Sequence, residues 1–162
     1  MIHVTYGQHL VANLSLRESK ISSLAQSKIA YLFKFTNDLT KNVKYAYGDY
    51  VASEATTNDR SIEVSILHHA TIEDIFGGSI NFKPYGYWTY EVYEVAWIGT
   101  VGINDTNAPN SETEVLTVND NNGVVQGKVH EGKLYVSETE GQEQIKYQKY
   151  EPSSSTNYVY TN

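Results

Sequence analysis

The side chains best suited to catalysis or metal binding in this chain are its five histidines, because the sequence contains no cysteine. His68 and His69 are adjacent, and neighbouring residues of a strand point to opposite faces, so these two imidazoles are not expected to share one ion. His3, His9 and His130 have no partner at the spacing of metal ligands. We therefore expect no metal site at the histidines, and structural or surface roles for all five.

Pairs of carboxylates are the second candidate for chemistry. Glu91 and Glu94, or Asp49 and Glu54, could in principle supply the acid and the base of a glycosidase. Glu91 and Glu94 are three residues apart in a segment that alternates like a strand, so their side chains should face opposite sides of the sheet. The sequence contains neither a G-x-S-x-G nucleophile elbow nor a phosphate-binding loop. These observations predict a protein that is not an enzyme and uses no cofactor.

Two loops are rich in oxygen ligands, namely 104–107 (NDTN) and 119–123 (NDNNG). Either could be interpreted as a calcium site, although the second lacks the D-x-D-x-D-G spacing of a calcium loop. Ordinary turn chemistry accounts for both loops. In the second loop, Asn122 and Gly123 predict a tight turn with positive φ between strands at 115–118 and 124–129.

The segment 86–97 (GYWTYEVYEVAW) concentrates aromatic side chains. A period of two places Tyr87, Tyr93 and Trp97 on one face, and Trp88 and Tyr90 on the other. Aromatics on both faces favour a strand that is covered twice, by the opposite sheet and by a neighbouring element or subunit. We therefore predict a core strand in which Tyr87, Tyr93 and Trp97 are candidate interface residues. The alternative is an exposed sugar-binding platform, formed from Tyr85, Tyr87, Tyr93 and Trp97.

These side chains must be positioned by strands. Alternation of apolar and polar residues predicts short strands at 29–35, 43–47, 61–68, 79–83, 87–97, 115–118, 124–129, 133–136 and 145–150. Turn residues predict three hairpins: the first two segments, 79–83 with 87–97, and 115–118 with 124–129. Thr71 followed by acids and a glycine pair predicts one short helical turn over 71–76. The expected fold is all-β, an antiparallel β-sandwich of jelly-roll or immunoglobulin type with about eight strands and extended terminal arms.

The two ends of the chain differ from its middle. Residues 1–28 have no clean period and predict an N-terminal arm or edge segment, whereas residues 29–150 are expected to form the sandwich domain. Residues 151–162 predict a flexible tail, in which Tyr158 and Tyr160 would contact a partner.

Charge and composition restrict the class of partner. The 162 residues carry a net charge of −7; residues 1–90 have 8 Lys or Arg and 8 Asp or Glu, and residues 91–162 have 4 and 11. Phosphate binding needs clustered cations, so we expect no direct nucleic-acid contact, with a local patch of Lys34, Lys41 and Lys44 as the alternative. The chain shows no basic apolar start and no long apolar run, which predicts a protein made in the cytosol that enters no membrane. Its 14 tyrosines favour half-buried sheets and interfaces.

Several segments resemble the small β-rich structural proteins of tailed bacteriophages, of the marine and crAss-like type. They are AYLFKFTNDLTKNVKYAY (30–47), YWTYEVYEVAW (87–97), GVVQGKVHEGKLYVSE (123–138) and the late QIKYQKYEP and NYVY segments. The resemblance implies a non-enzymatic virion component, assembled in the host cytoplasm and present as a homo-oligomer or in many copies. It implies binding to the major capsid protein or to other virion proteins.

Within that resemblance, a capsid auxiliary or decoration protein on the head shell is the first expectation. A head–tail connector or tail adaptor is the second. The expectation from another class is a carbohydrate-binding module for adhesion to the host surface.

Overall fold

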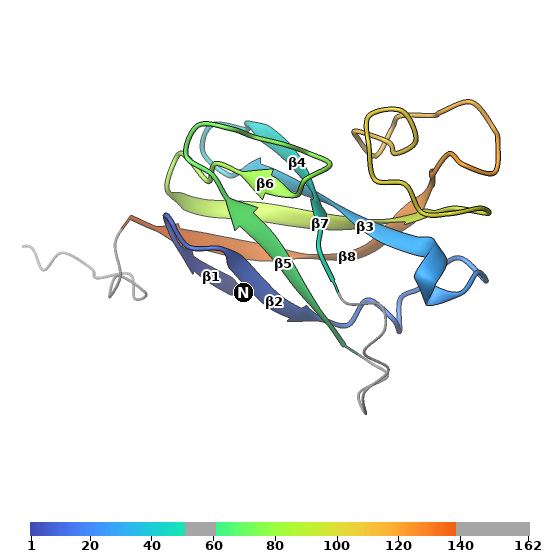
Figure 1. Ribbon diagram of the computed structural model, residues 1–162. Helices are drawn as coiled ribbons and strands as arrows, with labels where there is room; N and C mark the ends of the chain where they lie inside the picture. The colour runs from blue at the N-terminus through green and yellow to red at the C-terminus, as the bar shows by residue number, and fades with distance from the viewer. Residues whose placement is uncertain (51–60, 139–162) are drawn as a thin grey trace, which may run out of the picture.

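The computed structural model of the chain describes residues 1–50 and 61–138. They form two β-sheets packed face to face, with the three-stranded sheet in front of the five-stranded sheet in Figure 1. The elements are β1 (Ile2–Thr5), β2 (Leu10–Leu14), the 3-10 turn η1 (Gln26–Lys28), β3 (Ile29–Asn37), β4 (Val43–Gly48), β5 (Ile62–His68), β6 (Ser79–Ile80), β7 (Gly86–Ala96) and β8 (Val124–Ser137). The prediction of an all-β sandwich with about eight strands is confirmed.

The five-stranded sheet has the order β1-β8-β7-β3-β4, and the three-stranded sheet the order β2-β5-β6. β3 pairs antiparallel with both β4 and β7, so the predicted hairpin of the first two strands is confirmed. Each sheet also contains one parallel pair, β1 with β8 and β5 with β6. The long strands β3, β7 and β8 therefore form the frame of the larger sheet, and the shorter strands β1 and β4 add at its edges.

The main core lies between the two sheets. Alternate residues of β3 point into it, and among them Tyr31, Phe33 and Phe35 are almost completely buried. Trp88 and Val92 of β7 contribute from the neighbouring strand. Full burial of one such side chain contributes about 1.5–3 kcal/mol, so this face supplies most of the hydrophobic driving force.

A second, smaller core lies on the outer face, which is the face of the five-stranded sheet that points away from the three-stranded sheet. It contains Leu32, Tyr47, Val95 and Trp97. Residues 98–123, called here the covering loop, form the yellow-to-orange lobe against this sheet in Figure 1. The indole Nε1 of Trp97 donates a hydrogen bond to the carbonyl oxygen of Asn107 in this loop at 3.2 Å. The prediction that the aromatic strand is covered on both faces therefore holds at its Trp97 end, whereas Tyr87 at its other end is 37% exposed on the outer face.

Two predicted hairpins are wrong. The segment at 79–83 forms only the two-residue strand β6, which pairs in parallel with β5 and not with β7. Residues 115–118 lie in the covering loop without strand structure, and β8 continues unbroken from Val124 to Ser137. β7 pairs with β8 instead. Both strands are long, and their antiparallel ladder has irregularities at two places along its length.

Two local predictions are also corrected. The predicted helical turn over 71–76 is absent, because Asp74 and Ser79 exchange two backbone hydrogen bonds and close a hairpin-like turn. The described residues have their one helical turn at η1 instead. Gly123 does not adopt a positive φ; a Cβ there would lie 2.5 Å from the ring of Trp97, so the position requires a glycine for packing.

Residues 1–28 form edge strands: β1 lies at one edge of the larger sheet and β2 at one edge of the smaller sheet. The expected strand at 145–150, and the tail with Tyr158 and Tyr160, lie outside the described residues. In the part of the chain that the structure describes, no helix has the length and apolar character needed to cross a membrane.

Candidate functional site

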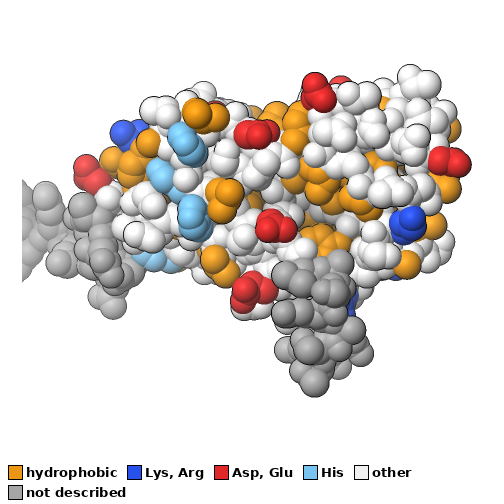
Figure 2. Space-filling model, in the orientation of Figure 1, with side chains coloured by type: hydrophobic (Ala, Val, Ile, Leu, Met, Phe, Trp, Pro, Cys, Tyr) orange, Lys and Arg blue, Asp and Glu red, His pale blue; other side chains and the backbone are white. Residues whose placement is uncertain are grey.

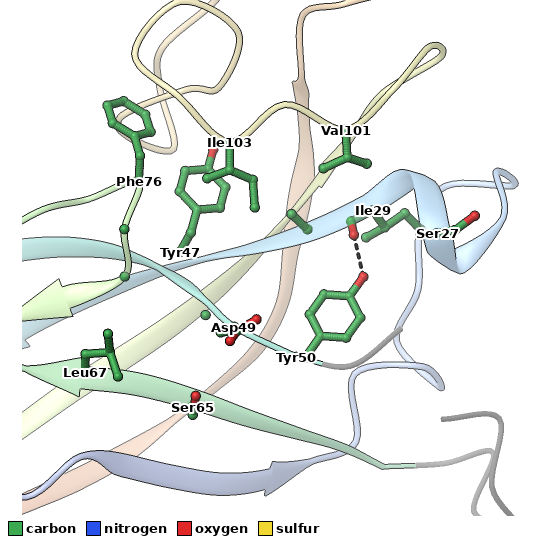
Figure 3. Close-up of a pocket in the computed structure, with 14 residues that line it drawn as sticks. Ser27, Ile29, Tyr47, Asp49, Tyr50, Ser65, Leu67, Phe76, Val101 and Ile103 are labelled. Carbon is green, nitrogen blue, oxygen red and sulfur yellow. Dashed lines mark hydrogen bonds between the residues drawn. The ribbon is translucent and has the colours of Figure 1, made fainter. Parts of the chain in front are cut away.

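A groove of about 340 Å³ opens where the end of β4 meets β5 and the covering loop (Figure 3). Its walls are mainly apolar and come from several separate places in the chain. They include Ile29 from β3, Tyr47 from β4, Leu67 from β5, Phe76 from the turn before β6, and Val101 and Ile103 from the covering loop. Figure 2 shows hydrophobic side chains gathered on this face beside the lobe.

The backbone at the end of β4 fixes the groove. The N–H of Asp49 donates to the carbonyl oxygen of Ser65 at 2.9 Å, and the N–H of Ser65 donates back to Asp49 at 2.8 Å. The N–H of Tyr47 donates to the carbonyl oxygen of Ile75 at 2.8 Å. Gly78 has a φ of 68°, and a Cβ there would collide with the carbonyl oxygen of Tyr47. The groove is therefore built from strand and turn backbone that is held in place by hydrogen bonds.

The tyrosine hydroxyls of the groove are already used by the fold. The hydroxyl of Tyr47 donates to the carbonyl oxygen of Pro109 at 2.7 Å, and that of Tyr50 donates to Ile29, as the dashed line in Figure 3 marks. Burial raises the pKa of both hydroxyls above the ordinary tyrosine value. Both phenols are therefore neutral at physiological pH, and they act as structural donors rather than as general bases.

Asp49 carries the only charge among the lining residues. Its carboxylate is exposed, lies near the middle of the lining in Figure 3, and makes no hydrogen bond or ion pair within the described residues. Leu67 and Ile103 beside it are 44% and 37% exposed. Among the lining residues that the structure describes, no nucleophile is hydrogen-bonded to a base.

The carboxylates Glu91 and Glu94 lie on opposite faces of β7, as predicted. Glu94 is completely buried on the inner side and accepts backbone hydrogen bonds from Ile21 at 2.9 Å and Ser22 at 2.7 Å. Glu91 lies on the outer face, 3.4 Å from the Nζ atom of Lys34 and 3.2 Å from that of Lys128. They cannot act together on one substrate. Glu54, the proposed partner of Asp49, lies outside the described residues.

Ion pairs order the outer face where it meets the covering loop. The ammonium group of Lys34 lies 2.6 Å from Glu112, which also accepts a hydrogen bond from the hydroxyl of Tyr45 at 2.6 Å. Burial opposes ionisation of Glu91 and Glu112, but the hydrogen bonds and charges of the lysines outweigh it and hold both pKa values below the ordinary range. Lys44 is paired with Glu73. Because Lys34 and Lys44 are neutralised in this way, the lysine patch considered above is a poor phosphate site.

The predicted interface residues occupy different environments. Tyr87 is 37% exposed on the outer face, and Tyr93 is half-buried on the same face. Trp97 is fully buried beneath the covering loop, so it belongs neither to a surface interface nor to a sugar platform. Tyr85 is exposed and packs against Tyr6, with ring centroids 5.1 Å apart.

His68 lies close to both His9 and His69, and histidine side chains gather at one end of the face shown in Figure 2. The N–H of His68 donates to Nδ1 of His9 at 3.0 Å, and Nδ1 of His69 accepts from the N–H of Ile72 at 2.9 Å. The described residues contain no group of three or more side chains placed to hold a metal ion. In the loops considered for calcium, the side-chain oxygens of Asn104 and Asn119 accept backbone hydrogen bonds as turn residues do.

The groove was not predicted from the sequence, although one residue of β5 indicates it. In 61–68 the residues at odd positions are polar, except Leu67, which interrupts the polar face of β5. Its neighbours in the groove come from distant parts of the chain, so no local pattern could assemble the site. Comparison of the chain with protein-family models, with curated protein sequences and with solved structures found no match.

Proposed function

We propose that the protein is a non-enzymatic structural component of a tailed-bacteriophage virion, bound to the head shell in many copies as a capsid auxiliary or decoration protein. The observation that carries this proposal is the groove at the end of β4. Its lining is mainly apolar, and its tyrosine hydroxyls already donate hydrogen bonds to backbone carbonyl oxygens of the fold. Such a surface suits binding to another protein. The resemblance of the strand segments to phage structural proteins supplies the kind of assembly.

The rest of the described surface supports a binding role as well. Ion pairs order the outer face beside the covering loop, and residues 91–162 carry the whole acidic surplus of the chain. Net charge keeps a multicopy protein soluble before assembly. The partner in this proposal is the major capsid protein or another virion protein.

Quantitative mass spectrometry of purified virions tests this proposal. A copy number that matches the capsomers is expected for a decoration protein. A copy number that matches a single portal ring would replace this role with that of a head–tail connector or tail adaptor. Absence of the chain from purified virions would contradict the virion proposal.

One observation favours a second function, carbohydrate binding for adhesion. Tyr87, Tyr135 and His3 form a row across β7, β8 and β1, with ring centroids 5.0 Å and 5.7 Å apart. The rings of Tyr87 and Tyr135 are tilted by 50°, so they do not form one flat platform, which makes this the second choice. On a glycan array, sugar binding that disappears in Tyr87→Ala and persists in Tyr85→Ala would favour this function over the first.

A further inference from the structure

We propose that the groove binds a lysine side chain presented by an extended segment of a partner protein. This inference rests on the proposed function as a binding protein and names the chemistry that the groove would recognise. The lining of the groove carries one negative charge and no positive charge. Asp49 lines the groove, and the other lining residues include no lysine, arginine or histidine. The carboxylate also has no ion-pair partner elsewhere in the described residues.

The position of this carboxylate is set by the fold. Both backbone groups of Asp49 are bonded to Ser65, which ties the end of β4 to β5. The carboxylate is therefore presented from a strand, and a ligand need not order a loop to reach it. A cation beside it would also be drawn by the net charge of −7 on the chain.

The apolar walls match the rest of a lysine side chain. Leu67 of β5 and Ile103 of the covering loop line the groove together with Asp49, and both are partly exposed. Lysine buries its methylene stem along apolar surface while its ammonium group stays near charge or water. The ammonium is a compact point charge, which suits one carboxylate with no second acid beside it.

The size of the groove supports a side chain and its flanking residues. Its volume of about 340 Å³ lies at the lower end of the range of about 300–1,000 Å³ typical of ligand pockets. Phe76 and Val101 also line the groove, so apolar residues on either side of the lysine would contact them. We therefore assign the site to a protein segment rather than to a free amine.

Titration of the full-length protein followed by NMR tests the charge requirement. The probes are Nα-acetyl-lysine amide and Nα-acetyl-norleucine amide, which has the same stem length without the ammonium group. The lysine probe should shift the amide signals of Gly48, Asp49 and Gly77 saturably and bind roughly threefold more tightly than the norleucine probe, as expected for one partly exposed ion pair. Equal affinity of the two probes, or no shift at these amides, would overturn the proposal.

Two variants with the same change of charge locate the effect. Asp49→Asn should remove the preference for lysine over norleucine, whereas Asp120→Asn, at an exposed carboxylate outside the lining, should keep it. Loss of the preference in both variants would show that net charge, and not the groove, selects the cation. That result would contradict the assignment to Asp49.

A third probe, acetyl-Leu-Lys-Leu amide, tests whether the occupant is a protein segment. It should bind more tightly than the single lysine, because its leucines would contact the apolar walls. Equal affinity would make the groove a site for free amines and would overturn this part of the proposal. If the chain is abundant in virions while the groove ignores every probe, this inference fails alone. If the groove binds as described while virions lack the chain, the proposed function fails alone.

Discussion

The two faces of the five-stranded sheet differ in what covers them and in the interactions that stabilise them. The inner face is continuous and apolar, with β3 and β7 supplying the large buried aromatics of the main core. The outer face is divided: the covering loop buries Trp97 and Leu32 at one end, and Lys34 beside them pairs with Glu91 of β7 and with Glu112 of the loop. The inner face therefore carries most of the stability of the fold. The outer face and the groove at its edge leave exposed surface that can bind a partner.

The largest effect is expected on the inner face. Trp88→Ala removes a fully buried side chain from the main core and should lower the free energy of unfolding by about 3–5 kcal/mol, because a large cavity is left behind. Chemical denaturation followed by fluorescence measures this loss. Val115→Ala is the control, because Val115 is 89% exposed and its truncation should change little. A loss below about 1 kcal/mol for Trp88→Ala would break the distinction between the faces.

The second core should respond more locally. Gly123→Val places a side chain against Trp97 and Val95, and we expect a loss of about 1–3 kcal/mol from overpacking. Hydrogen exchange should show faster opening of residues 98–123 than of β3 and β7, since the covering loop closes only this core. Uniform acceleration across both faces would mean that the second core is not separable from the first.

A smaller effect is expected at the ion pairs of the outer face. Lys34→Met removes the cation that contacts Glu91 and Glu112, and should lower the free energy of unfolding by about 0.5–1 kcal/mol at low salt. At about 1 M salt the difference should shrink, because screening weakens partly exposed pairs. Lys41→Met, at an exposed position outside these pairs, is the matched control. A loss that is independent of salt would argue against an electrostatic origin.

The same carboxylates predict a modest pH dependence. The folded-state pKa values of Glu91 and Glu112 lie below the ordinary value of about 4.3. A carboxyl group of this kind stabilises the fold above that value and loses its contribution as the pH falls through the lower folded-state pKa. Wild-type stability should therefore fall below about pH 4 more steeply than that of Lys34→Met. Parallel pH profiles of the two proteins would be inconsistent with this account.

Local patterns predicted the frame of the fold. The alternation in 29–35 and 87–97 follows from the two-residue period of a strand whose two faces lie in different environments, and β3 and β7 form there. β8 was divided into two strands because its glycines resemble turn residues. In the structure, Gly127 adopts a φ of 149° within the strand, close to the second of the two irregularities in the β7–β8 pairing.

The remaining features depend on contacts between distant segments. The parallel pairing of β1 with β8 joins opposite ends of the described chain, and periodicity says nothing about which strand meets which. The same holds for the groove, where Asp49, Leu67 and Ile103 come from separate elements. The burial of Trp97 depends on the covering loop, whose sequence predicts turns and a short strand at 115–118 but no contact with Trp97.

The most direct test of the account is zero-length carbodiimide cross-linking of intact virions, read by mass spectrometry. This chemistry joins a carboxylate to an amine only when the two are in contact. We predict a link between Asp49 and a lysine of another virion protein, with the exposed control Asp120 left unlinked to that lysine. Virions that contain the chain but link Asp120 and not Asp49, or virions that contain no copy of the chain, would contradict the account.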